Sequence, residues 1–247
     1  REALARWLAS FSDLAGIVVI QEGRGKLWLR SKREIKRIGL LRFLDVVAFR
    51  VYYKLFLARA DAQCEQDTLN AVRSTTQPLR DDLPVLFTKS PNSPETEAFI
   101  KRLQPDIVIA RCKILLKDRI YKIPSRGTFV MHPGICPEYR NSHGCFWALA
   151  NDDAERVGMT LLKIDDGVDT GPIYGYFGCR FDSVRDSHIV IQMRTVFDNL
   201  DAIREKLIEI YEGKAETIDV RGRKSAAWGQ PWLTRYIRWK LRARRGQ

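Results

Sequence analysis

The chain has 247 residues, of which 45% are hydrophobic and 29% charged, a composition typical of a soluble globular protein with one large domain. Its five cysteines form no CxxC pair and no secretory leader is visible, which excludes a disulfide framework and a zinc site and indicates a reducing, cytoplasmic setting. The net charge of +12 is uneven, because residues 24–61 hold eleven Lys or Arg against three acids, and residues 221–247 hold nine and no acid.

Apolar runs and helical spacings alternate along the chain. A helix is predicted from Glu2 to Ser10, and because the chain begins near its start without Met, a further N-terminal segment is expected. Helices are also predicted over 32–66, 93–104, 118–123 and 186–213. Strands are predicted over 14–20, 83–87, 106–110, 127–131, 158–164 and 172–181. This alternation predicts a doubly wound, mostly parallel α/β sheet, in which ligands bind beyond the carboxyl ends of the strands.

Two polar turns follow predicted strands. His132 begins the turn His132-Pro133-Gly134, and Asp169 begins Asp169-Thr170-Gly171-Pro172, 37 residues later. A histidine and a carboxylate that meet in a fold can act as a general acid/base pair. The alternatives are a structural histidine at a strand end and an aspartate that caps a turn.

A series of short motifs surrounds these two residues. In chain order they are Pro105-Asp106-Ile107-Val108-Ile109, Ile114-Leu115, Ile123-Pro124, His132-Pro133-Gly134, Pro137, Tyr139-Arg140, Trp147-Ala148, Gly158-Met159-Thr160 and Gly167-Val168-Asp169-Thr170-Gly171-Pro172-Ile173. In order and spacing, the stretch from about Leu103 to Gly175 resembles the folate-dependent formyltransferases. This family includes glycinamide ribonucleotide, methionyl-tRNA and sugar N-formyltransferases.

The resemblance implies a Rossmann-like domain that transfers a formyl group from 10-formyltetrahydrofolate to an amine, without a metal ion. His132 and Asp169 match the catalytic His and Asp of the family. The turns at 111–115 and 165–169 correspond to its folate pocket, so the expected folate-binding residues are Arg111, Ile114, Leu115, Asp165, Asp166 and Gly167. Beside the acceptor amine we expect Gly134, Tyr139 and His143.

One position departs from the family pattern. The Asn that lies two residues before the catalytic His is Val130 here, which cannot donate a hydrogen bond to the formyl oxygen. Losing one such donor costs about 100- to 1,000-fold in turnover. Asn141 is expected to be the third catalytic residue in its place, with His143 and Arg111 as alternatives. Hydrolysis of the formyl folate, a different acyl donor and a catalytically inactive binding role are the alternative functions.

Two segments flank this core. Residues 38–60 are apolar nearly all round, but their charged residues exclude a clean transmembrane span. They predict a helix that lies on an anionic membrane surface, enters a homodimer interface or packs against the sheet. The tail over 221–247 interleaves aromatic and aliphatic residues with cations and suits a membrane or another phosphate-rich partner.

The expected organisation is an α/β domain over 1–213, with a helical insertion at about 32–66, followed by a basic aromatic extension over 214–247. Only 78 residues follow Asp169, which is short for the second domain of the tRNA-acting family members. The expected acceptor is therefore an amino sugar, linked to a nucleotide or to a lipid. The expected location is the cytoplasm, at the periphery of a membrane if both basic segments bind one.

Overall fold

This computed structural model describes residues 2–21 and 35–246. The strands within these residues form three sheets. A four-stranded sheet has the order β3-β4-β6-β7. Its strands are β3 (Ile107–Ala110), β4 (Gly127–His132), β6 (Met159–Lys163) and β7 (Ile173–Phe177). Two further parallel pairs join β1 (Ile17–Ile20) to β2 (Val85–Thr88), and β5 (Arg140–Asn141) to β8 (Ala227–Trp228).

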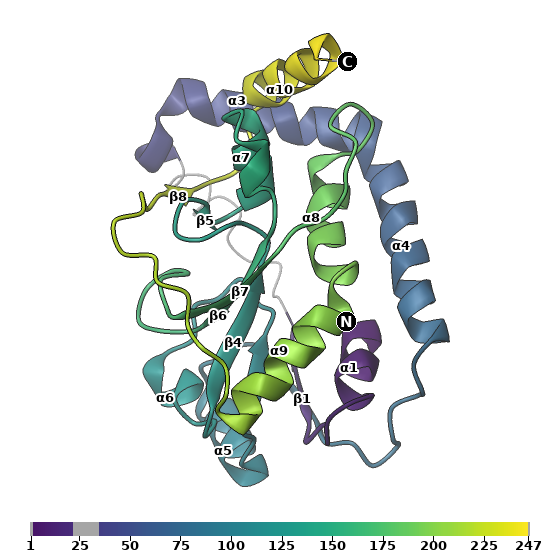
Figure 1. Ribbon diagram of the computed structural model, residues 1–247, viewed down its shortest axis with the longest axis vertical. Coiled ribbons are helices and arrows are strands. Elements are labelled where there is room, and N and C mark those ends of the chain that lie inside the picture. The colour runs from purple at the N-terminus through teal and green to yellow at the C-terminus, as the bar shows by residue number, and fades with distance from the viewer. Residues whose placement is uncertain (1, 22–34, 247) are drawn as a thin grey trace.

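Helices cover one side of the central strands and both ends of the molecule (Figure 1). The side helices are α1 (Glu2–Ala9), α4 (Ala58–Ser74), α8 (His188–Phe197) and α9 (Leu200–Glu212). One end carries α5 (Pro94–Leu103) and α6 (Asp118–Tyr121), and α3 (Leu40–Tyr52) and α10 (Leu233–Arg245) cross the opposite end, next to α7 (Gly144–Ala150). A π-helix, Tyr53–Leu57, joins α3 to α4, and a short 3₁₀ helix covers Ala154–Arg156.

The predicted α/β class is confirmed, and the strand directions refine it. Strand β3 pairs with β4 in parallel, but β4–β6 and β6–β7 are antiparallel pairs. For β6–β7 the reason lies in the connection, because residues 164–172 are too few for the helical crossover that a parallel pair requires. The parallel neighbours β3 and β4 end at the same edge of the sheet. The loops after Ala110 and after His132 therefore lie on that edge.

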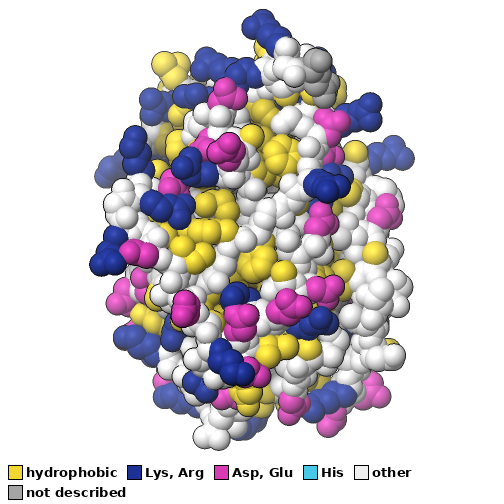
Figure 2. All heavy atoms as spheres, viewed as in Figure 1, with side chains coloured by type: hydrophobic (Ala, Val, Ile, Leu, Met, Phe, Trp, Pro, Cys, Tyr) yellow, Lys and Arg dark blue, Asp and Glu magenta, His cyan; other side chains and the backbone are white. Residues whose placement is uncertain are grey.

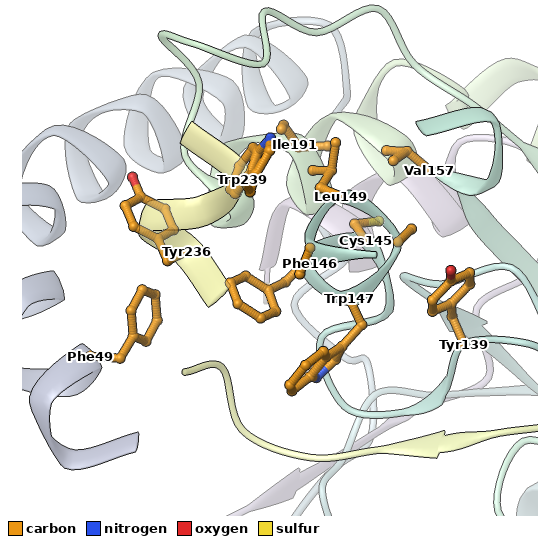
Figure 3. Close-up of a cluster of buried hydrophobic side chains, with 12 residues drawn as sticks. Phe49, Tyr139, Cys145, Phe146, Trp147, Leu149, Val157, Ile191, Tyr236 and Trp239 are labelled. Atoms are coloured by element: carbon orange, nitrogen blue, oxygen red, sulfur yellow. The ribbon is translucent and has the colours of Figure 1, made fainter. Parts of the chain in front are cut away.

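Two hydrophobic clusters hold the layers together. The first packs the inner faces of β4, β6 and β7 on α1 and α9, with Phe129, Met159 and Leu161 fully buried between them. The second is built around α7, where Phe146 contacts Phe49 of α3 and Trp239 of α10 (Figure 3). Since α7 directly follows the loop after His132, this second cluster fixes the far end of the loop.

The prediction of a single helix over 186–213 is wrong, because two helices, α8 and α9, occupy this range. Asn199 interrupts it with φ −116° and ψ 14°. Its side-chain Nδ2 donates to the carbonyl oxygens of Gly178, at 2.7 Å, and Thr195, at 3.0 Å. An asparagine side chain that bonds to nearby backbone competes with the helical hydrogen bonds, which ends α8 at Phe197. The predicted terminal glycine is confirmed, since Gly213 has φ 74° after α9.

The helices predicted over 32–66 are present from Leu40 onward as α3, the π-helix and α4, which runs on to Ser74. That they form an insertion into the α/β domain stays a prediction. Residues 32–34 of the predicted insertion lie outside the described residues. The basic tail contains a strand and a helix, β8 and α10, that the sequence did not predict. Both pack back on the core, so the tail is part of the same folded body (Figure 1).

Candidate active site

His132 ends strand β4 with its side chain buried. The ring is 7% exposed, and its Nε2 lies 2.9 Å from the carbonyl oxygen of Tyr139. A carbonyl oxygen can only accept a hydrogen bond, so Nε2 carries a proton and donates it. Nδ1 is therefore the ring nitrogen that remains for chemistry.

Asp169 lies beside this second nitrogen. Its Oδ2 is 3.5 Å from Nδ1 of His132 and accepts a hydrogen bond from the backbone N–H of Asn141 at 2.8 Å. Asp169 has φ 52°, in the left-handed region that aspartate tolerates better than most residues. The fold thus brings together the histidine and the carboxylate that the sequence separates by 37 positions. Both ring contacts are favourable when Nδ1 is protonated as well.

The turn that carries Asp169 is fixed by its own residues. Asp165 Oδ1 accepts a hydrogen bond from the backbone N–H of Gly167 at 3.0 Å. A Cβ atom at Gly171 would lie 1.9 Å from the carbonyl oxygen of Lys163, so only glycine fits where the turn returns to the sheet. The backbone of this turn therefore sets where the Asp169 carboxylate lies.

A pocket opens where the loop after β3 faces this turn. Its lining residues are Ala110, Cys112, Ile114, Leu115, Leu116, Val130, Leu162, Ile164, Asp165, Asp166, Gly167 and Asp169. Five of the six residues expected to bind folate are in this lining, and Arg111 is not. One wall is aliphatic and the other is a polar turn, an arrangement that suits a flat ring with hydrogen-bonding groups along one edge.

The departure at Val130 is visible in this pocket. Val130 lies in its wall and packs with Leu162 and Ile173, so the position where the family carries an amide is aliphatic here. In the polar wall, the carboxylate of Asp166 accepts a hydrogen bond from the Tyr121 hydroxyl. This hydrogen bond is the largest of the causes that raise the pKa of the Tyr121 hydroxyl to about 12.

Asn141 supports the pair mainly through its backbone. Besides the N–H that holds Asp169, its side-chain Nδ2 donates to the carbonyl oxygen of Trp228 at 2.5 Å. Its φ of 78° is tolerated by asparagine. This geometry is that of a residue that positions Asp169, and a direct catalytic role for its amide stays a prediction.

The three residues expected near the acceptor lie in different environments. Gly134 packs on the catalytic ring, since a Cβ atom there would be 2.8 Å from Nε2 of His132. Tyr139 is buried, and its hydroxyl donates to Asp153 at 2.8 Å, so its carbonyl alone contacts His132. Burial lowers the pKa of His143 to about 4, which keeps that ring neutral. Acceptor binding by these residues stays a prediction.

Comparison with known proteins places this geometry in a family. The sequence model of the family described as "Formyl transferase" matches residues 59–205, more than half of the chain. The chain belongs to the formyl transferase family. The match includes His132, Asp169 and every residue that lines the pocket.

Curated relatives share part of this formyl transferase. The methionyl-tRNA formyltransferase of Dehalococcoides mccartyi strain CBDB1 is 37% identical over 100 residues, 40% of this chain and 32% of the relative. That of Kosmotoga olearia is 38% identical over 92 residues, 37% of this chain and 29% of the relative. The matched segment thus spans about a third of these relatives.

A solved structure from Mycobacterium tuberculosis shares the fold. That protein is described as uncharacterised and as a candidate sugar N-formyltransferase. It is 19% identical in sequence, with a TM-score of 0.50, over 74% of this chain and 84% of its own. This likeness extends the formyl transferase fold beyond the segment that the curated relatives share.

In this formyl transferase, the tail holds the loop after His132, a contact that no local sequence pattern predicts. Arg223 forms a two-pronged ion pair with Glu138, at 2.9 and 2.7 Å. Trp228 Nε1 donates to the Glu138 carbonyl at 2.8 Å, and β8 pairs in parallel with β5. Arg140 in turn donates to the carbonyl of Val168 at 2.8 Å. The tail, the loop and the Asp169 turn are therefore linked by consecutive hydrogen bonds.

The cysteines near the site behave as small hydrophobic residues. Cys136 and Cys145 are fully buried, and burial raises the pKa of each thiol to about 12. Both thiols are protonated at neutral pH, which argues against nucleophiles. Among the residues that the structure describes, no three His, Cys, Asp or Glu side chains are grouped to hold a metal ion.

Proposed function

We propose that this protein transfers the formyl group of 10-formyltetrahydrofolate to the amine of an amino sugar. The observation that carries the proposal is the pair of buried His132 and half-buried Asp169 at the edge of a pocket with one aliphatic and one polar wall. Ile114, Leu115 and Val130 fit the face of a flat ring, and the 165–167 turn fits its polar edge. Bound there, 10-formyltetrahydrofolate would supply the activated formyl group.

The pair can both hold and move protons. At 3.5 Å, the contact between Nδ1 of His132 and Asp169 is longer than a good hydrogen bond. The Nδ1–H group can therefore donate instead to an oxygen that becomes negative during attack by the amine. This hydrogen bond stabilises the developing charge. The Asp169 carboxylate stabilises the charged ring and can accept the proton that the attacking amine loses. The bond between the formyl carbon and the folate nitrogen then breaks, and the Nδ1–H group can donate its proton to the departing nitrogen. Burial of the ring strengthens both effects, because little water screens them.

We infer an amino-sugar acceptor from fold-level comparison. The M. tuberculosis protein of the same fold is a candidate sugar N-formyltransferase, whereas these two methionyl-tRNA enzymes match over 100 and 92 residues. This supports testing amino-sugar nucleotides first. Methionyl-tRNA is the second acceptor class, favoured by the 37–38% identity over those residues.

Calorimetry with the stable analogue 5-formyltetrahydrofolate tests the donor site. Saturable binding is expected for the wild type, for Asp169→Asn and for His132→Gln, because the pocket walls remain. Leu115→Arg is expected to abolish binding, since Leu115 lines the pocket and is 63% exposed. Unchanged binding in Leu115→Arg, or none in the folded wild type, would refute the site.

A turnover assay then tests the acceptor. The purified protein is incubated with 10-formyltetrahydrofolate and, in turn, amino-sugar nucleotides, methionyl-tRNA or buffer alone. Formamido-sugar product, detected by mass spectrometry and absent in His132→Gln, is the expected result. Formyl-methionyl-tRNA would replace the acceptor assignment, and formate release in buffer alone would indicate a hydrolase. Folate binding without any product would leave a binding role.

A further inference from the structure

Helix α3 and the π-helix expose an apolar stripe that nothing in the described chain covers. Leu40, Leu44, Val47 and Val51 recur at helical spacing on one face, and the π-helix continues the surface with Leu55 and Phe56. Leu55 is 69% and Phe56 67% exposed, and Leu41, beside the stripe, is 84% exposed. Isolated exposed aliphatic residues are common, but a run of this length is characteristic of an interaction surface.

The stripe is not needed to hold α3 on the protein. The opposite face of the helix buries Val46 and Phe49, and Phe49 packs on Phe146 and Tyr236, with ring centroids 5.8 and 5.3 Å apart. The helix therefore has two apolar faces, one in the core and one in solvent. Folding explains only the first face.

The helical segment that carries the stripe exposes cations and no acid. Arg42, Arg50 and Lys54 lie on the same helical segment and are exposed. Its one acid, Asp45, accepts hydrogen bonds from the backbone N–H and the hydroxyl of Thr234 on α10. This acid is thus turned toward the neighbouring helix and is already bonded.

Helix α10 adds to the same end of the molecule (Figure 1). It carries six Lys or Arg and no acid, and it exposes Ile237 at 44% and Leu241 at 48%. Its buried face, with Tyr236 and Trp239, packs on α3 and α7. Figure 2 shows Lys and Arg side chains gathered around this end, with hydrophobic side chains between them. Both helices lie outside residues 59–205, so this end is an addition to the family core.

We propose that α3, the π-helix and α10 form a docking surface for an anionic lipid bilayer. Aliphatic side chains flanked by cations match the boundary between acyl chains and negatively charged headgroups, where a helix lies in the plane of the membrane. None of the helices in the described ranges combines the length and hydrophobicity needed to cross a bilayer. A nucleic acid would use the cations and leave the stripe without a role, and a second copy of the chain would meet like charges. The proposal does not depend on the proposed reaction.

Flotation with lipid vesicles tests the surface. Vesicles of phosphatidylcholine alone are compared with vesicles that also contain phosphatidylglycerol. The wild type is expected to bind the anionic vesicles at least about tenfold more tightly than the neutral ones, and less tightly at high salt. The double variant Leu44→Glu/Val51→Glu is expected to lose at least about tenfold in binding, because it places charges in the stripe.

Two further variants separate the surface from general effects. Ile208→Glu on α9 is the matched control, since Ile208 is also exposed, at 39%, but lies away from α3 and α10. It is expected to bind within about twofold of the wild type. Arg238→Glu/Arg245→Glu is expected to weaken binding to anionic vesicles while leaving the stripe intact. Circular dichroism checks that each variant is folded.

Three results would overturn the proposal. The first is equal binding of the wild type to neutral and anionic vesicles, or no binding. The second is a lipid-free dimer that Leu44→Glu/Val51→Glu converts to a monomer, which would assign the stripe to a second copy. The third is binding to a short RNA that matches vesicle binding in strength and is unchanged by that variant. Formyl transfer to a water-soluble acceptor is expected to be unaffected in all three variants, so a failure here is distinguishable from a failure of the proposed reaction.

Discussion

Replacing Asp169 with asparagine is the sharpest test of the site. The two side chains have the same shape, so the variant keeps an oxygen that can accept the hydrogen bond from Asn141. It removes only the negative charge that lies 3.5 Å from Nδ1 of His132. The expected result is a folded protein that binds folate normally and turns over slowly.

The size of the loss follows from the geometry. At 3.5 Å, an ion pair is stabilised by at most about 5 kcal/mol for an effective dielectric constant of about 20. Since each 1.36 kcal/mol changes a rate tenfold, the upper limit is a loss of about 3,000-fold. General acid/base groups contribute about 100- to 10,000-fold. We therefore expect kcat to fall by about 100- to 3,000-fold with KM for folate nearly unchanged.

The assay is steady-state formation of tetrahydrofolate with a saturating acceptor, compared for wild type, Asp169→Asn and Asp153→Asn. Asp153 is a matched control because it is also a partly buried carboxylate that contacts the site loop, through the Tyr139 hydroxyl. Activity of Asp153→Asn is expected to stay within about threefold of the wild type. A folded Asp169→Asn protein with wild-type kcat would refute the assigned role of the pair.

Three other substitutions or conditions give defined outcomes. Val130→Asn is expected to raise kcat by up to about tenfold and to lower the urea midpoint, because an amide replaces a methyl group packed on Leu162. Gly134→Ala is expected to destabilise the fold by at least about 2 kcal/mol in urea unfolding, since its Cβ would lie 2.4 Å from the Tyr139 carbonyl oxygen. Burial lowers the pKa of His143 from 6.5 to about 4. The unfolded chain therefore binds more protons between these values, and the free energy of unfolding is expected to fall by about 3 kcal/mol as the pH drops from 6.5 to 4. Urea unfolding at several pH values measures this fall, and a His143→Phe variant should reduce it.

Local patterns were enough to predict the elements that build the pair. The strand before His132 is an apolar run that ends in His-Pro-Gly, and such runs form buried strands whatever surrounds them. The turn at 165–171 contains the Asp and Gly residues whose backbone preferences define it. The order of these motifs then indicated which side chains would meet. The resulting pocket contains the predicted Ile114, Leu115 and Gly167.

What the sequence could not predict depends on contacts between distant residues. The break at Asn199 is made by the Gly178 carbonyl, 21 positions away, and helical spacing continues across it. The side chain of Tyr139 bonds to Asp153 and stacks on Trp228, partners that lie 14 and 89 positions away. The pairing of β5 with β8 joins residues 87 positions apart. None of these partners is marked by a local pattern.

The linkage of the tail to the site has a consequence for synthesis of the protein on the ribosome. The strand and the two turns that carry the pair are made first, but Glu138 and Asn141 also bond to Arg223 and Trp228, which are made later. A nascent chain that has emerged to residue 217 thus contains His132 and Asp169 but lacks the segment that bonds to Glu138 and Asn141. These hydrogen bonds can form only after residues 223–228 have been made.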